Sequence, residues 1–478
     1  MRVSDYYKLK RSQPTLDFVD VDVRGDSRIF VDPRALRLLH SSWADECAAL
    51  VQNFFQAVLR EIRRGANARA RSLLSVLKEP NETHLGLSKG KAQGRALGQK
   101  SARNVWKALS ESEVVKTGLL EDLEDTILMV PGISSDIISD ITTNLIRGPL
   151  IQYTQEMANH YGIPLQTGVN SGPLWDSGNK RWHSELVSLA MTKWGRLLLV
   201  PKAIVRLKLD YDVNEYYRHY LLEHLKEVEL KANTELVHLI KKTKQRHVTK
   251  KDLIAKYGSG KDMIVRETQK YPSVLERYRN KKARTHHPPL DHFDLSSSEG
   301  TPPPDWDTLL SDIHGIPSGR DTSSLYENAI EALLSALFYP SMAYPQVQHK
   351  IHEGRKRIDI TYTNMATNGF FFWLGQHYTA PHVFVECKNY LGDPENPELD
   401  QISSRFSPSR GQVGIIVCRK FTNKDLFLKR CQDTAKDQRG FVIALDDSDL
   451  NLLVGERKKF TNPTEFQLLK QRFENLVM

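Results

Sequence analysis

Alternation of hydrophobic and polar residues is clearest in the last third of the chain. Short apolar stretches rich in β-branched and aromatic residues predict strands there, and apolar residues three and four apart predict helices. The predicted strands cover residues 346–351, 357–360, 383–388, 413–418 and 440–445, and the predicted helices cover residues 324–338, 399–406, 423–436 and 447–455. This order begins α-β-β-β-α-β and predicts an α/β domain. The uninterrupted apolar run at 413–418 is typical of a buried parallel strand.

The first 285 residues are predicted to form a larger, helix-rich region of mixed α/β type. Residues 17–23 and 28–32 alternate like short strands, and residues 35–64 carry an apolar stripe at helical spacing. A further strand is predicted at residues 196–200 and a long amphipathic helix at residues 214–238. No internal repeat is found at periods of about 20 to 50 residues, so a repeat architecture is not expected.

The segment between these two regions has a different composition. Residues 285–323 are dense in proline, glycine and serine and include the run Pro302-Pro303-Pro304. Such composition predicts an extended linker. The predicted organisation is an N-terminal region at residues 1–285 that binds substrate or senses a trigger, a linker at residues 286–322, and a C-terminal domain at residues 323–478.

Overall composition narrows the class of protein. A chain of 478 residues with a hydrophobic fraction of 40% supports two or three domains with sizeable cores. No stretch approaches about 18 uninterrupted apolar residues, and residues 1–13 lack the apolar core of a signal peptide, so no membrane span is expected. The four cysteines lack metal-ligand spacing, which predicts free thiols in a reducing cytoplasm.

Positive charge is concentrated in one segment. Residues 241–284 contain fifteen Lys and Arg against four Asp and Glu, a local charge of +11, whereas the whole chain carries +9. This excess favours nucleic-acid contact through Lys250, Lys251 and Lys261, since clustered cations attract polyanions; a solvated helical connector is the alternative. A glycine-rich basic run at residues 86–107 fits phosphate contact and a flexible loop equally well, and it lacks P-loop spacing.

Ionisable residues interrupt the apolar alternation in two of the predicted strands. Period two points Asp359 away from its isoleucine neighbours and puts Glu386 and Lys388 on one face of their strand. If the strands pair with Asp359 on the face of Glu386, two carboxylates and one ammonium group converge. Carboxylate oxygens suit Mg²⁺ or Mn²⁺, which activates water and screens phosphate charge. A divalent metal site is therefore predicted, with ordinary cross-strand charge pairing as the alternative.

Asp359 and the triplet Glu386-Cys387-Lys388, within the α-β-β-β-α-β order, resemble the PD-(D/E)xK nuclease superfamily with its restriction-endonuclease-like fold. The resemblance covers about residues 320–455, and Ile358 stands where the proline that names the motif is expected. It implies that Asp359, Glu386 and the Cys387 carbonyl bind the metal. It also implies that Lys388 positions the attacking water and stabilises charge on the phosphate.

The same resemblance extends to two neighbouring helices. Tyr326-Glu327 before an apolar run is similar to the start of Mrr-like restriction nucleases, which implies a catalytic role for Glu327. Glu331 lies one helical turn later and is the second choice for that role. Gln401 and Arg405 are four residues apart just after the lysine strand, so they are candidates for nucleic-acid contact. A solvated helix face is an equally open interpretation for Gln401.

These expectations describe a Mg²⁺- or Mn²⁺-dependent endonuclease that hydrolyses phosphodiester bonds, with DNA as the expected substrate. The family resemblance implies a cytoplasmic effector of prokaryotic antiviral defence or restriction, acting as a homodimer or with a partner subunit of a defence system. Two other classes remain open: a non-catalytic nucleic-acid-binding protein, and a scaffold subunit of a defence or repair complex. Metal-dependent cleavage separates the nuclease from the first, and salt-sensitive DNA binding separates it from the second.

Overall fold

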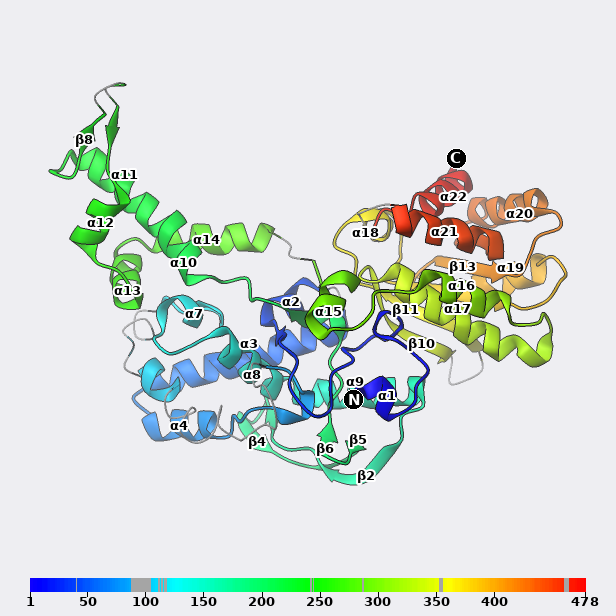
Figure 1. Cartoon of the computed structure of the whole chain (residues 1–478), viewed down its shortest axis with the longest axis horizontal. Helices are drawn as coiled ribbons and strands as arrows, with labels where there is room; N and C mark the ends of the chain where they lie inside the picture. The colour runs from blue at the N-terminus through cyan, green and yellow to red at the C-terminus, as the bar shows by residue number, and fades with distance from the viewer. Residues whose placement is uncertain are drawn as a thin grey trace.

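The computed structural model has a C-terminal lobe, an N-terminal body, and an arm of helices that projects from that body (Figure 1). It describes residues 1–478 except for 40, 87–104, 111, 113–114, 116–117, 241–242, 244, 286–287, 352–355 and 460–463. Most of the glycine-rich basic run at residues 86–107 therefore lies outside the described residues.

The C-terminal lobe is built on a five-stranded mixed sheet. Its strands, in spatial order, are β10 (Met342–Ile351), β11 (Lys356–Asn364), β12 (His382–Lys388), β13 (Val413–Cys418) and β14 (Phe441–Asp446). The first three pair antiparallel and the last three pair parallel. All six residues of β13 are buried, which explains its uninterrupted apolar sequence.

Helices cover this sheet and close its core. They are α17 (Ser323–Phe338), α18 (Gly369–His377), α19 (Asn396–Ser403), α20 (Lys424–Lys436), α21 (Asp447–Lys459) and α22 (Gln467–Val477). The strands and helices predicted for this domain are present at nearly the predicted positions, and the mixed α/β class is confirmed. Helices α18 and α22 are not among the predicted elements. In α18 the aromatic run buries Phe370 and Phe371 in the same core as the sheet, so the segment is helical and packed.

The N-terminal body is mostly helical around one large core. Its helices are α1 (Val3–Tyr6), α2 (Pro33–Leu38), α3 (Ser42–Arg63), α4 (Asn67–Ser75), α7 (Asp125–Met129), α8 (Ser135–Leu145) and α9 (Arg147–Tyr161). Its short strands are β1 (Phe30–Val31), β2 (Leu165–Asn170), β3 (Leu174–Asp176), β4 (Arg181–His183), β5 (Leu186–Thr192), β6 (Gly195–Leu197) and β7 (Val205–Arg206). They form small separate sheets, β1-β7, β2-β5-β6 and β3-β4.

Three predictions for the body need correction. Residues 17–23 form isolated bridges and no strand, because both alternating faces are buried and Asp20 is satisfied by the side chain and amide of Ser4. The predicted helix at 35–64 is two helices. It breaks before Ser41, whose hydroxyl accepts from the Ala44 amide at 3.2 Å and so caps α3. The strand predicted at 196–200 is shorter, since β6 ends at Leu197.

The arm contains α10 (Val213–Glu215), a π-helical turn (Tyr216–Leu221), α11 (Leu222–Ala232), β8 (His238–Leu239), β9 (Arg246–His247), α12 (Lys250–Tyr257), α13 (Lys261–Lys270) and α14 (Pro272–Arg284). It projects from the body on the side away from the C-terminal lobe (Figure 1). The helix predicted at 214–238 ends at Ala232 because Asn233 adopts the left-handed conformation that terminates helices, with φ 49°.

The predicted extended linker at residues 286–322 contains two helices, α15 (His292–Glu299) and α16 (Trp306–His314). Buried residues anchor both. His292 Nε2 lies 2.8 Å from the Ala336 carbonyl of α17, and Ile313 belongs to the C-terminal core. The prediction of an extended linker was wrong because these apolar and buried residues outweigh the proline run, which only separates the two helices.

Buried polar contacts connect the body to the C-terminal lobe. Asp17 accepts hydrogen bonds from the Tyr153 hydroxyl at 2.7 Å and from the Tyr344 amide at 2.9 Å. The ammonium group of Lys202 is buried 4.2 Å from the centre of the Tyr339 ring. Tyr339 and Tyr344 therefore pack with the core of the body, although they follow α17 in the sequence.

The four cysteines all lie in described segments, where they are buried and free, as predicted. In the part of the chain that the structure describes, no helix combines the length and the apolar character needed to cross a membrane.

Candidate active site

Strand pairing brings the two predicted metal ligands together. Ile360 of β11 lies opposite Val385 of β12 in an antiparallel ladder, so the next position in that register places Asp359 opposite Glu386. The Asp359 carboxylate accepts a hydrogen bond from the Cys387 amide at 2.9 Å. The side chains of β12 alternate as expected, because Val385 and Cys387 enter the main core whereas Phe384 joins a separate cluster.

Gln401 joins the carboxylate and the lysine of the predicted triplet. Its side-chain amide donates to Glu386 Oε2 at 3.1 Å, and its carbonyl oxygen accepts from Lys388 Nζ at 3.1 Å. Lys388 Nζ also lies 3.6 Å from Glu386 Oε2. Lys388 is therefore held against the buried carboxylate by a neutral side chain from α19.

Close packing of α19 on the sheet places Gln401. Gly414 of β13 leaves room for this contact, since a Cβ there would lie 2.5 Å from the Ile402 side chain and 3.1 Å from Phe406. The sequence analysis proposed nucleic-acid contact for Gln401, and the structure instead turns it toward Glu386 and Lys388. A glutamine near a lysine strand gives no sequence signal for this orientation, because the packing partner is a distant glycine.

Arg405 is also buried beside Glu386. Its Nε lies 3.1 Å from Glu386 Oε1 but donates to the Arg357 carbonyl at 2.6 Å. Glu386 Oε1 accepts no hydrogen bond from any described residue. The structure thus directs both Gln401 and Arg405 to the carboxylate, and it leaves one fully buried carboxylate oxygen without a donor.

Glu327 borders the same site from α17. It is half-buried and accepts from the side-chain amide of Gln348. Burial raises the pKa of Glu327, and the charge of Asp359 raises it further. Glu331, the second choice, points elsewhere: it is fully buried and forms an ion pair of 2.6 Å with Arg11 of the body.

Burial and charge act strongly on Glu386 and Cys387. Burial raises the pKa of Glu386 to about 8, and the Asp359 charge acts in the same direction, against Lys388 and Arg405. Burial likewise raises the pKa of the Cys387 thiol well above its usual value. Because this thiol lies in the core, only the Cys387 carbonyl can serve as the ligand predicted at that residue.

The donor set fits a small, hard cation only in part. Among the described residues, no three Asp, Glu, His or Cys side chains lie close enough together to hold a metal ion by themselves. The predicted ligands are two carboxylates and one backbone carbonyl, all oxygen donors of the type that Mg²⁺ prefers. A cation there would supply the partner that the buried Glu386 Oε1 lacks.

The lysines predicted to contact nucleic acid have three different surroundings. Lys250 forms an ion pair of 3.2 Å with Glu223, and Lys261 donates to the carbonyls of Val130 and Ile133 at 2.7 and 3.1 Å. Lys251 is exposed on α12. The prediction overlooked the partners of Lys250 and Lys261, which come from segments distant in sequence.

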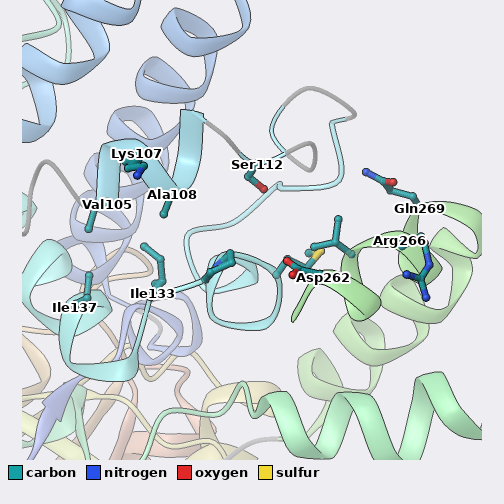
Figure 2. Close-up of a pocket in the computed structure, with 13 residues that line it drawn as sticks. Val105, Lys107, Ala108, Ser112, Ile133, Ile137, Asp262, Arg266 and Gln269 are labelled. Atoms are coloured by element: carbon teal, nitrogen blue, oxygen red, sulfur yellow. The ribbon is translucent and has the colours of Figure 1, made fainter. Parts of the chain in front are cut away.

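Figure 2 shows a cavity far from this site, between the body and the base of the arm. Its volume is about 780 Å³, and it lies between the Pro131-Gly132 turn and α13. Ile133 and Ile137 line it on the side of the body, and Asp262, Arg266 and Gln269 line it on the side of the arm. None of the residues predicted for catalysis takes part in it.

Comparison with known proteins gives one match. Residues 8–212 match the model of a family described as a domain of unknown function, DUF8370, which covers less than half of the 478 residues. The match ends just before α10, so it includes neither the arm nor the C-terminal lobe. No curated protein and no solved structure matches the chain.

Proposed function

We propose that the protein is a Mg²⁺- or Mn²⁺-dependent nuclease that hydrolyses phosphodiester bonds in DNA. The observation that carries the proposal is the meeting of Asp359 and Glu386 across paired strands, with Lys388 Nζ 3.6 Å from the Glu386 carboxylate. Two carboxylates can hold a divalent cation that activates water, and a lysine beside them can stabilise negative charge on a phosphate.

The architecture of the lobe supports assignment of this site to the restriction-endonuclease-like fold. Helix α17 precedes three antiparallel strands and α19 follows the lysine strand β12. Strand β13 pairs parallel to β12, and β14 pairs parallel to β13. This is the order on which the resemblance to the PD-(D/E)xK superfamily rests. The role as a cytoplasmic restriction or antiviral-defence effector, and action as a homodimer or with a partner subunit, are proposed from that resemblance alone.

Each residue has a distinct role in the proposed chemistry. Asp359, Glu386 and the Cys387 carbonyl would hold the metal, which when bound acidifies water and neutralises phosphate charge. Lys388 orients the attacking water and stabilises the negative charge that builds on the phosphate. Gln401 fixes Lys388 relative to Glu386, and Glu327 accepts a proton or hydrogen bond at the edge of the site.

A non-catalytic nucleic-acid-binding protein with the same fold is the second candidate. The observation that favours it is the contact of Gln401 with both Glu386 Oε2 and Lys388 Nζ, which gives these two atoms a partner without a metal. In that case the carboxylate and the lysine stabilise the packing of α19 on the sheet, and divalent metal has no effect on the protein.

Cleavage of plasmid and linear DNA tests the proposal. The wild-type protein is incubated with Mg²⁺ or Mn²⁺, or with EDTA, beside Lys388→Ala and a control, Lys429→Ala, which removes an exposed lysine from α20. We expect metal-dependent cleavage by the wild type and the control, and loss of cleavage in Lys388→Ala. Cleavage that survives Lys388→Ala would place the site elsewhere, and DNA binding without cleavage would favour the second candidate.

A further inference from the structure

The cations of the arm fall into two groups. One group is neutralised by carboxylates, in the pairs Lys250–Glu223 at 3.2 Å, Lys256–Glu229 at 2.5 Å, Lys270–Glu267 at 3.1 Å, Arg279–Asp125 at 2.5 Å and Lys282–Glu215 at 2.7 Å. In contrast, Arg277, Lys281 and Arg284 are exposed, and none forms an ion pair with a described residue. Three of the cations without an ion pair to a described residue therefore lie together on α14, and three others, Arg246, Lys251 and Lys261, lie elsewhere in the arm.

Helical geometry places the three free cations on one face. Their spacing of four and then three residues aligns them along one side of α14, over about 10 Å at a rise of about 1.5 Å per residue. The side of α14 next to the stripe is buried through Val274, Leu275 and Tyr278. The stripe thus lies on a helix that packs in the arm through its neighbouring side, and the three cations are exposed.

Ring side chains flank one end of this stripe. Tyr220 packs against Tyr278 with ring centres 4.9 Å apart, and His224 packs against Tyr271 at 4.7 Å. Burial lowers the pKa of His224, and the charge of Arg277 lowers it further, so Arg277 lies near this ring. Tyr220, His224 and Tyr271 are each partly exposed, which leaves ring surface beside the guanidinium group.

We propose that the face of α14 with Arg277, Lys281 and Arg284 is a docking surface for the phosphate backbone of nucleic acid. Duplex DNA carries one charge per about 1.7 Å of its axis, so a stripe of about 10 Å meets several phosphates at once. Binding at this surface is expected to be independent of base sequence, because the cations contact phosphate groups and not the edges of the bases. The proposal rests on the proposed function only for the identity of the polyanion.

This surface gives the arm a role that differs from catalysis. Figure 1 shows α14 running from the arm back toward the middle of the molecule, whereas β8 and α12 lie at the end far from the C-terminal lobe. Asp359 and Glu386 belong to the lobe, so α14 contributes no residue to the candidate active site. The stripe increases the local concentration of substrate without a part in the chemistry.

Salt dependence of DNA binding provides the test. The full chain is titrated with a labelled DNA duplex in EDTA, so cleavage is excluded, at salt concentrations between about 50 and 200 mM. The variant combines Arg277→Gln, Lys281→Gln and Arg284→Gln. The matched control combines Lys429→Gln, Lys436→Gln and Lys470→Gln, which removes the same charge from exposed positions on α20 and α22 at the other end of the molecule.

The wild type and the control are expected to bind DNA with the same steep dependence on salt. The slope of log K against log salt in the α14 variant is expected to be shallower by about 2.7, at about 0.9 per lost phosphate contact, with affinity at least about tenfold weaker at low salt. A circular dichroism melt confirms that each variant is folded.

An unchanged salt slope in the α14 variant would overturn the inference, and so would an equal loss of DNA affinity in the control. No DNA binding by the wild type would also overturn it and would favour an acidic protein partner. Binding through α14 without any metal-dependent cleavage would leave this inference standing and remove the proposed nuclease activity. Normal cleavage and unchanged DNA binding in the α14 variant would contradict the inference about α14 and leave the proposed nuclease activity standing.

Discussion

Arg11, near the start of the chain, forms an ion pair of 2.6 Å with Glu331 on α17, the helix that carries Glu327. The Glu331 side chain is fully buried and that of Arg11 is 15% exposed. His160 of the body lies 3.7 Å from the same carboxylate, and the Ser335 hydroxyl donates to it at 2.6 Å. The body therefore holds α17 through a buried charge one helical turn from the candidate active site.

Removal of Arg11 is expected to destabilise the protein strongly. Arg11→Ala leaves the Glu331 carboxylate buried without its main counter-charge, and loss of one partner of a buried pair costs about 3–5 kcal/mol. The midpoint of urea unfolding measures this loss. The control is Arg24→Ala, which breaks an exposed pair with Asp22 and should leave the midpoint nearly unchanged. Equal midpoints in the two variants would show that the Arg11–Glu331 pair does not hold the lobes together.

The same pair predicts a loss of stability in acid. Burial alone would raise the pKa of Glu331, but the charge of Arg11 and the contacts with His160 and Ser335 outweigh it and lower the pKa to about 2. A carboxyl whose pKa is lower in the folded state stabilises the protein fully above its unfolded pKa, ordinarily 4.5. This contribution is lost as pH falls from there through about 2.

Urea midpoints of the wild type and Glu331→Gln, measured from pH 6 to pH 3, test this expectation. The advantage of the wild type over the variant should shrink steadily as pH falls through this range. A difference that is constant with pH would mean that Glu331 does not titrate as the ion pair requires.

A buried carboxyl in the body has the opposite dependence. Burial raises the pKa of Asp140 to about 9, with further contributions from the charges of Asp136, Glu79 and Asp26. Its contribution to stability is full below the unfolded pKa near 3.8 and is lost as pH rises through about 9. Asp140→Asn should therefore melt at a higher temperature than the wild type at pH 8, and the gain should diminish at pH 5. A melting temperature below that of the wild type at both pH values would contradict this, and Asp437→Asn, an exposed acid, serves as the control.

Gln401 is expected to be a positioning residue for the proposed reaction. Gln401→Ala removes the acceptor of Lys388 and a donor to Glu386, so cleavage should fall about 10–100-fold, the range for residues that orient metal ligands. The pH dependence of the rate should also shift, because the Glu386 carboxylate loses a hydrogen-bond donor that favours its charged form. Gln401→Glu should restore the contact with Lys388 but repel Glu386. If the cleavage rate falls only in proportion to the amount of folded protein, and the pH profile is unchanged, Gln401 contributes to packing and does not position Lys388.

Sequence patterns predicted the elements of the C-terminal lobe because each strand is defined locally. Alternation pointed Asp359 away from its isoleucine neighbours and put Glu386 on one face with Lys388, and the observed register places Asp359 opposite Glu386. A local sequence pattern does not show which residue each polar side chain will contact. Gln401 turns inward because α19 packs over Gly414, and Lys250 is neutralised by Glu223 of another helix.

The errors have the same physical origin. The proline-rich segment predicts a linker by composition, yet His292 and Ile313 anchor helices there through contacts with distant residues. The local charge of +11 predicts a basic surface. Where that surface lies depends on which Lys and Arg side chains form ion pairs with carboxylates in the folded protein. Long-range pairing therefore decides which cations remain without an ion pair, and the structure shows three of them together on α14.

Binding of Mn²⁺ tests the central claim most directly, since it requires neither the correct nucleic acid nor an activating trigger. Calorimetric titration compares the wild type with Asp359→Asn, Glu386→Gln and a control, Asp433→Asn, which removes an exposed carboxylate from α20. We expect the wild type and the control to bind Mn²⁺ alike, and each site variant to bind at least about tenfold more weakly because it loses a charged oxygen ligand. Equal affinity in all four proteins, or no binding by the folded wild type, would contradict the assignment of Asp359 and Glu386 as a metal site.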